Sequence, residues 1–228
     1  MKVEVLSLGG SVIIPKSTDN IDVKFLKEFK KILLSFKDRN FVVVAGGGST
    51  ARKYMQALGS IGVEKKSKCL IGIALTRLHA RLLTYFFGKC AAPQNPTNLK
   101  DIRKLVKKYK VVFTGALRYE EDNTSDGTAA KIANYFRTSF VNVTDVKGLF
   151  NKDPKKYKDA KLIRTISFQE FNKIMSKMQY SPGQHFILDQ HAAKIIKKHK
   201  VKTVILDKNL RNLKNCLQGK KFLGTIIQ

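Results

Sequence analysis

The sequence contains no tryptophan, only three cysteines and only five prolines among its 228 residues. Cys69, Cys90 and Cys216 are odd in number and far apart, so they form neither a disulfide framework nor the close spacing of a zinc site. We therefore expect no metal site built by the protein alone, and a reducing cytoplasm as the compartment. The sequence also lacks any stretch of about 18 uncharged apolar residues, so we expect no membrane span.

Acidic residues are scarce as well, with 17 Asp and Glu against 44 Lys and Arg and a net charge of +27. Such an excess is typical of nucleic-acid-binding proteins, but it also arises from a general lysine bias. The lysines are dispersed, outnumber the arginines and are not interleaved with aromatic residues, unlike a base-reading surface. We therefore favour the general bias and expect no specific nucleic-acid partner, although the charge should attract anionic nucleotides.

The sequence is rich in alternating strand-like and helix-like segments. This alternation predicts an α/β fold with a mostly parallel sheet covered by helices on both faces. The expected strands cover residues 3–8, 41–45, 111–114, 139–143, 202–206 and 222–227. The expected helices cover residues 23–36, 50–58, 70–87, 99–109, 126–136, 167–175, 188–199 and 210–218.

Two glycine-rich turns follow the first two expected strands. The first is Gly9-Gly10-Ser11, and the second is Gly46-Gly47-Gly48-Ser49-Thr50. Consecutive glycines are costly to order, and they suit a backbone that passes close to a bulky anion held by amide groups and a helix N-terminus. Two such turns favour two phosphorylated ligands. Neither turn matches the dinucleotide or P-loop motif, and a purely structural role for the first turn stays open.

Three polar residues outside the glycine turns are candidates for a site. Arg52 lies one helical turn after Gly48, where its guanidinium can fold back onto an anion at the helix start. Asp126 and Asp189 each begin an expected helix and are candidates to hold Mg²⁺-bound water or a lysine. Helix N-capping is the alternative interpretation for both aspartates.

These motifs occur together with several others in a fixed order. The set is Leu8-Gly9-Gly10-Ser11, Ala45-Gly46-Gly47-Gly48-Ser49-Thr50-Ala51-Arg52-Lys53-Tyr54, Gly72 with Thr76-Arg77, Thr124-Ser125-Asp126, Thr144-Asp145-Val146-Lys147-Gly148-Leu149-Phe150, Asp153-Pro154 and Leu188-Asp189. Over essentially its whole length the chain resembles the amino acid kinase superfamily, and within it the archaeal-type uridylate (UMP) kinases. The related isopentenyl phosphate kinases carry a histidine after the second glycine turn, which this sequence lacks.

The resemblance implies a three-layer α/β/α sandwich around an eight-stranded, mostly parallel sheet. Residues 1–138 would form an N-terminal lobe that binds UMP and makes subunit contacts, and residues 139–228 a C-terminal lobe that binds ATP, both on one continuous sheet. The implied reaction transfers the γ-phosphoryl group of ATP, carried with Mg²⁺, to UMP to give UDP. The implied assembly is a homo-oligomer, either a hexamer arranged as a trimer of dimers or a dimer.

The resemblance also implies roles for individual residues. The catalytic centre would contain Gly9, Gly10, Ser11, Arg52 and Asp189. The ATP site would contain Gly48, Arg52, Thr144, Asp145, Phe150 and Asp153. The UMP site would contain Gly47, Gly115, Thr124 and Ser125, on and beside a loop over residues 115–124.

The sequence departs from the family pattern at several positions. Ser7 stands where many members have a lysine, Cys69 where an aspartate holds the UMP ribose, and Lys147 where an aspartate precedes a glycine. The acceptor loop also carries acids at residues 120–122. These departures keep two alternatives open: a kinase for another small acceptor, such as isopentenyl phosphate or an acidic amino acid, and a catalytically silent nucleotide-binding regulator. If the protein is a kinase, we expect Lys16 or Lys147 to supply the missing cation.

Overall fold

Seven strands form one sheet in the computed structural model, which describes residues 2–120, 123–152, 154, 156–177 and 188–228. The strand order is β3-β2-β1-β4-β6-β7-β5. The strands are β1 (Lys2–Leu8), β2 (Arg39–Ala45), β3 (Val111–Thr114), β4 (Phe140–Thr144), β5 (Thr165–Ile166), β6 (Thr203–Asp207) and β7 (Thr225–Ile227). All neighbouring strands are parallel except β6 and β7, which confirms the expected mostly parallel sheet.

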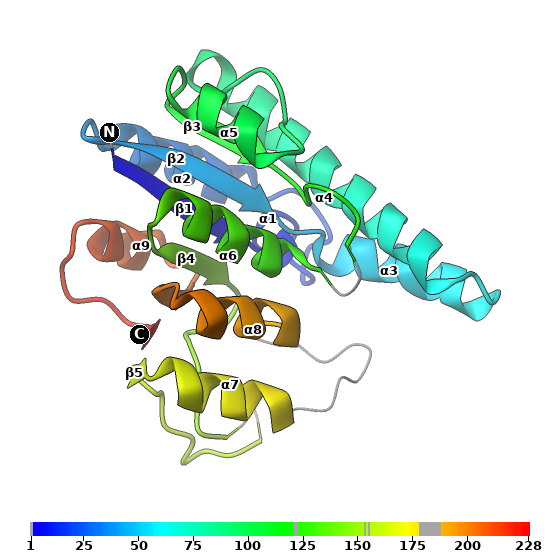
Figure 1. Ribbon diagram of the computed structural model, residues 1–228, viewed down its shortest axis with the longest axis vertical. Coiled ribbons are helices and arrows are strands. Elements are labelled where there is room, and N and C mark those ends of the chain that lie inside the picture. Colours follow the sequence, from blue (N-terminus) through cyan, green and yellow to red (C-terminus); the bar gives the residue numbers. More distant parts are fainter. Residues whose placement is uncertain (1, 121–122, 153, 155, 178–187) are drawn as a thin grey trace.

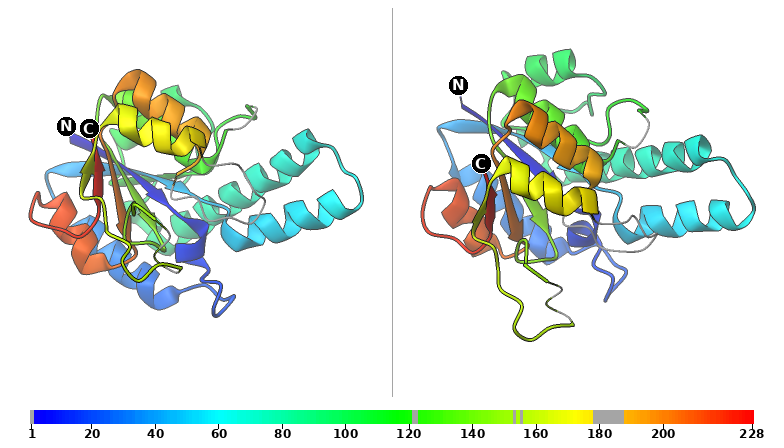
Figure 2. Two further views of the ribbon diagram at one scale, coloured as in Figure 1. Left: turned by 90° about the horizontal axis from the view of Figure 1, so that it is seen from below. Right: turned by 60° about the horizontal axis from the view of Figure 1, so that its bottom comes forward.

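Helices cover both faces of this sheet and make three layers (Figures 1 and 2). Helices α1 (Gly10–Ile13), α2 (Val23–Ser35), α4 (Lys65–Phe87) and α9 (Leu210–Leu217) contribute buried side chains to the core on one face. Helices α5 (Leu99–Val106), α6 (Ser125–Phe136), α7 (Phe168–Lys177) and α8 (Gln190–His199) form the core on the other face. The expected α/β/α sandwich is therefore confirmed.

The central strands are apolar on both sides because both of their faces are covered. In β2, Phe41 and Val43 enter one core, whereas Val42 and Val44 enter the other. This assignment follows from the two-residue period of a strand. It explains why the sequence shows a continuous apolar run here rather than an alternation of apolar and polar residues.

The expected eighth strand is absent from the described residues, so the strand count was wrong by one. The chain does form a short hairpin, in which Asn151 N–H donates to Lys161 O at 3.1 Å and Ile163 N–H donates to Leu149 O at 2.8 Å. Only one isolated bridge, Phe150–Leu162, joins the two sides. The segment between the two sides is rich in lysine and contains Pro154, neither of which favours a strand.

Helix α3 (Gly48–Ser60) and the N-terminal half of α4 form a hairpin that projects from the body of the molecule (Figures 1 and 2). Together with the turn after it, Lys65–Cys90, α4 is long and apolar enough to cross a membrane by length and composition, with a third (33%) of its most apolar window buried. Its C-terminal half, however, packs Ala80, Leu83 and Phe87 into the core. We therefore interpret α4 as a core helix with one protruding end.

Candidate active site

The two glycine turns meet at the carboxyl ends of the neighbouring parallel strands β1 and β2. Gly46 N–H donates to Leu8 O at 2.9 Å, and Gly9 N–H donates to Val143 O at 3.0 Å. A Cβ atom on Gly10 would lie 2.2 Å from the backbone nitrogen of Gly48. Glycine is therefore required where these two backbones touch.

Helices α1 and α3 begin directly in these turns, at Gly10 and Gly48, and neither helix start is capped by a side chain. The first amide groups of a helix have no partner within the helix, and they carry the positive end of its dipole. Two uncapped helix starts in backbone contact are suited to hold negatively charged groups side by side. This arrangement matches the expectation of an anion site built by the glycine turns.

Two carboxylates meet beside the first turn, each brought there by a different element. On β1, Ser7 is buried and donates its hydroxyl to Asp126 Oδ1 at 2.7 Å. On the connection between β3 and α6, Thr124 donates its hydroxyl to Asp189 Oδ2. Removal of the Asp126 carboxylate from water, and then the negative charge of Asp189, raise the pKa of Asp126 to about 7.

The structure separates the two interpretations of these aspartates. Asp189 caps α8, because its carboxylate accepts from Ala192 N–H at 2.8 Å. Asp126 does not cap α6. That role belongs to Thr124, whose hydroxyl oxygen accepts from Gly127 N–H at 3.1 Å. Asp189 thus caps its helix through Oδ1, while its Oδ2 faces Thr124. The capping interpretation is wrong for Asp126, which faces Ser7 instead.

Helix α4 holds the second glycine turn and the start of the loop after β3. The Nδ1 atom of the buried His79 lies 2.7 Å from Gly46 O. Thr76 accepts from Ala116 N–H at 2.9 Å, and Arg77 donates to the carbonyl groups of Ala116 and Leu117. No site role was predicted for His79. Polar residues on the buried face of an otherwise apolar helix are the signal that would have identified it.

The loop after β3 carries the residues expected to bind the acceptor. Gly115 is pressed against α4, since a Cβ there would lie 2.6 Å from Thr76 atoms. Thr124 and Ser125 start α6 beside the two carboxylates. Glu120 is exposed and paired with Lys131, in agreement with the interpretation that it points into solvent. Glu121 and Asp122 lie outside the described residues.

Two further polar side chains near this loop were not predicted. Asn123 Oδ1 and His191 Nε2 are buried without a hydrogen-bond partner among the described residues. Both side chains adjoin Gly127, where a Cβ would lie 2.6 Å from Asn123 Oδ1 and 3.0 Å from His191 Cδ2. No spacing rule in the sequence links residues 68 positions apart, so only the fold brings them together.

The residues expected to hold the ATP nucleoside follow β4. Thr144 ends this strand, and its Cα would lie 3.8 Å from a Cβ on Gly9, so it adjoins the first glycine turn. Asp145 is exposed and Phe150 is half-buried on the connection that follows. Asp153 lies outside the described residues.

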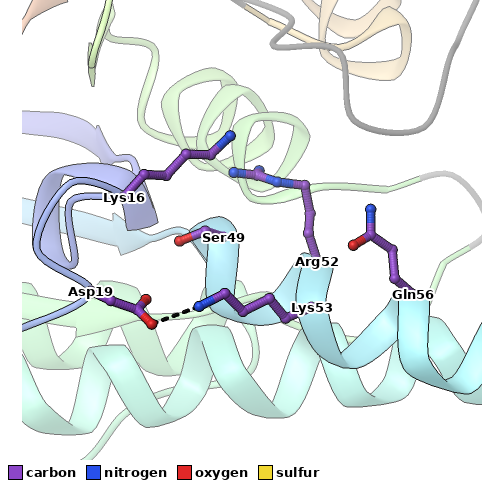
Figure 3. Close-up of a pocket in the computed structure, with 6 residues that line it drawn as sticks. All are labelled: Lys16, Asp19, Ser49, Arg52, Lys53 and Gln56. Carbon is purple, nitrogen blue, oxygen red and sulfur yellow. Dashed lines mark hydrogen bonds and ion pairs between the residues drawn. The ribbon is translucent and has the colours of Figure 1, made fainter.

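A basic cavity of about 310 Å³ lies between the segment after α1 and the outer side of α3 (Figure 3). Its lining residues are Lys16, Asp19, Ser49, Arg52, Lys53 and Gln56. The structure therefore places Arg52 beside the start of α3, as the sequence predicts. Cys69 lies on α4 as a half-buried free thiol.

The chain was compared with known proteins. Residues 2–207 match the model of the amino acid kinase family. A uridylate kinase from Thermoplasma volcanium is 36% identical over 225 residues, covering 98% of this chain and 96% of the relative. A uridylate kinase from Archaeoglobus fulgidus is 35% identical over 229 residues, covering all of both chains.

Solved structures agree with this result. The crystal structure of uridylate kinase from Archaeoglobus fulgidus superposes with a TM-score of 0.82 at 33% identity, over the full length of both chains. An isopentenyl phosphate kinase superposes with a TM-score of 0.70 at 20% identity, covering 99% of this chain and 100% of that one, and this likeness shows the shared fold alone. The family match over most of the chain and the full-length relatives lead to one conclusion: the chain belongs to the amino acid kinase family.

Proposed function

We propose that this protein is a UMP kinase, which transfers the terminal phosphoryl group of ATP to UMP in pyrimidine nucleotide synthesis. The observation that carries the proposal is the backbone contact of two uncapped glycine-turn helix starts at the ends of β1 and β2. Phosphoryl transfer requires two anionic ligands to be positioned in line and their charge to be neutralised. Full-length relatives named uridylate kinase support UMP as the acceptor.

The proposed ATP side begins at the two glycine turns and continues past β4. Backbone amides of Gly9, Gly10, Ser11 and Gly48 would donate to the phosphates, because such amides are already fixed in place. Arg52 would add a charge-assisted contact. Thr144, Asp145, Phe150 and Asp153 would surround the nucleoside.

The proposed UMP side is the cleft wall made by the second turn and the loop after β3. Gly47 and Gly115 would contact the acceptor through their backbones. Thr124 and Ser125, at the start of α6, would bind its phosphate, where the helix dipole favours negative charge. Asp189 would position Thr124, since the two side chains share a hydrogen bond.

The residues present fit a magnesium ion that arrives with the nucleotide. Mg²⁺ is usually held by one or two carboxylates together with substrate phosphates and water. Asp126 and Asp189 are the two carboxylates at this centre. When bound, the ion would neutralise phosphate charge. Among the residues that the structure describes, no three His, Cys, Asp or Glu side chains gather into a metal site.

A panel assay tests this function against its alternatives. ADP release is measured with MgATP and, separately, UMP, CMP, isopentenyl phosphate and an acidic amino acid. UMP should give the highest kcat/KM. Preference for another acceptor would favour a same-fold kinase with a different substrate. Such a preference would agree with Cys69, which stands where the family has the aspartate that holds the UMP ribose. Silence on the whole panel with intact ATP binding would favour a regulatory protein.

We also propose a cytoplasmic homo-oligomer, either a hexamer arranged as a trimer of dimers or a dimer. Large apolar side chains are exposed on α3, on the turn after it and along α4, namely Tyr54, Ile61, Leu70, Ile71, Leu78 and Tyr85. Such residues cluster at subunit contacts more often than on free surfaces. Light scattering on the purified protein gives the mass, and a monomer would contradict the assembly.

A further inference from the structure

The basic cavity beside α3 contains polar groups that the protein itself leaves without partners. Ser49 is only 7% exposed, and its hydroxyl has no hydrogen-bond partner among the described residues. The Nη2 atom of Arg52 is equally buried and unpartnered within the same part of the chain. A buried donor without an acceptor costs about 1–3 kcal/mol, and more for a charged group. An acceptor from outside the protein is therefore indicated.

Charge identifies that acceptor as an anion. Three cations, Lys16, Arg52 and Lys53, line the cavity with a single carboxylate, Asp19. Asp19 already pairs with Lys53 at 2.6 Å. Lys16 and Arg52 point toward one another across the cavity (Figure 3). Neither has an ion pair with a described residue, so their mutual repulsion is uncompensated until an anion lies between them.

The backbone of α3 adds to the positive potential in the cavity. Helix α3 starts at Gly48 without a side-chain cap, and Ser49 is the second residue of the helix. The cavity thus combines a helix N-terminus, a buried hydroxyl donor and two unpaired cations. The terminal phosphate groups of a nucleotide suit this combination, because phosphate oxygens accept charge-assisted hydrogen bonds from cations and are favoured at a helix N-terminus.

We propose that Lys16 and Ser49 join Arg52 in holding the terminal phosphates of the donor nucleotide, and that Lys16 supplies the cation that position 7 lacks. The inference rests on the proposed kinase function. Ser7 occupies the family's lysine position and is hydrogen-bonded to Asp126, so it adds no charge there. Lys147 was the other candidate for this cation. It is exposed, and it does not line the cavity.

The test compares wild type with Lys16→Met, Lys16→Arg and the control Lys24→Met, which removes an exposed lysine on α2. Dissociation constants for MgATP and AMP are measured by calorimetry. Lys16→Met should weaken ATP binding about tenfold to a hundredfold, the size of one charge-assisted contact, and leave AMP binding unchanged. Lys16→Arg should retain most of the affinity for ATP, and Lys24→Met should retain all of it.

Equal ATP affinity in wild type and Lys16→Met would overturn the proposal, as would a parallel loss of ATP and AMP binding. Inorganic triphosphate tests whether the cavity binds the triphosphate group of ATP or a separate anion. It should compete with ATP for the wild-type protein, and binding without competition would also overturn the proposal.

Turnover separates this inference from the proposed function. If wild type phosphorylates UMP, Lys16→Met should lower kcat/KM for ATP while the KM for UMP and the unfolding temperature stay unchanged. If wild type is inactive on every acceptor yet binds ATP through Lys16, the kinase function fails and the assignment of Lys16 stands.

Discussion

At the scale of single residues, the pairing of Ser7 with Asp126 distinguishes this site. A lysine at position 7 would stabilise the negative charge of Asp126, whereas the Ser7 hydroxyl donates one neutral hydrogen bond at 2.7 Å. Burial, and then the negative charge of Asp189, raise the pKa of Asp126 from its ordinary 3.8 to about 7, although the Ser7 hydrogen bond acts in the opposite direction. The carboxylate thus titrates close to neutral pH, where it can change charge when a metal-bearing nucleotide arrives.

This shift makes a prediction about stability. Asp126 keeps its proton up to about pH 7 in the folded protein, whereas it loses it near pH 4 in the unfolded chain. Its contribution to stability is therefore fully present below about pH 4. That contribution is lost as the pH rises from about 4 to 7. Asp126→Asn keeps the shape of the protonated acid and cannot ionise. The variant should therefore gain stability over wild type as pH rises from about 4 to 7.

Urea unfolding of the nucleotide-free and Mg²⁺-free proteins, at several pH values, measures this difference. The difference in unfolding free energy between variant and wild type cancels the contributions of the other titrating groups. A free-energy difference that is constant across the pH range would show that Asp126 is not perturbed. The same variant should lose most of its turnover, since the carboxylate lies at the proposed transfer centre.

At the scale of elements, α4 connects the two halves of the proposed acceptor site. His79 contacts the glycine turn after β2, and Arg77 holds the carbonyl groups of Ala116 and Leu117. One rigid helix therefore fixes the spacing between Gly47 and the loop that begins at Gly115. Because α4 also enters the core, this spacing does not depend on the loop's own sequence.

We predict that Arg77→Ala raises the KM for UMP more than the KM for ATP. Loss of the guanidinium frees two loop carbonyl groups, and the loop then samples other positions before it binds the acceptor. A structural cost of about 1–3 kcal/mol accompanies the change. Steady-state kinetics with each substrate varied in turn give the comparison, and Arg103→Ala, at an exposed position on α5, is the control. Equal changes in both KM values would contradict a role specific to the acceptor loop.

The contact between the two glycine turns gives a second prediction at this scale. Gly10→Ala would place a methyl group 2.2 Å from the Gly48 nitrogen, so the turns must separate. We expect a loss of about 1–3 kcal/mol of stability together with nearly complete loss of activity.

The matched control for Gly10→Ala is Gly59→Ala in α3. A Cβ at Gly59 meets only the far end of Lys68, at 3.8 Å or more. This change should be neutral or slightly stabilising, because alanine favours a helix over glycine by roughly 0.5–1 kcal/mol. Thermal unfolding and the kinase assay measure both variants, and full activity in Gly10→Ala would show that the turns do not need their close approach.

At the scale of the whole molecule, the net charge of +27 is the dominant feature. The basic residues are distributed over the surface, and three of them, Lys16, Arg52 and Lys53, line the cavity beside α3. The long-range field should therefore raise the local concentration of anionic nucleotides without selecting one polymer sequence.

We predict that any binding to nucleic acid is weak, independent of sequence and sensitive to salt. Only the counterion-release contribution should act, because the lysines are dispersed along the sequence and are not interleaved with aromatic residues. Fluorescence anisotropy with oligonucleotides of different sequence, at about 50 and 200 mM salt, tests this expectation. Selective binding that persists at the higher salt concentration would contradict it and would assign a second role to the charge.

The sequence by itself determined the α/β class, the position of most helices and the two glycine turns. These features follow from local periodicity and from the backbone freedom of glycine, which the sequence displays directly. The short elements α1 and β5 were not predicted, because four and two residues are too few to show a period. The family resemblance implied eight strands, whereas the described residues form seven, with only an isolated bridge between Phe150 and Leu162 in the segment after β4.

Only the tertiary structure decided which residues meet. Ser7 and Asp126 are 119 positions apart, and Thr124 and Asp189 are 65 apart, yet each pair shares a hydrogen bond. The structure also placed Lys16 opposite Arg52, although the sequence alone left Lys16 and Lys147 equivalent. Such contacts depend on strand order and on helices burying their apolar faces against a common sheet. Those long-range choices minimise exposed apolar surface over the whole chain, so no local window of sequence contains them.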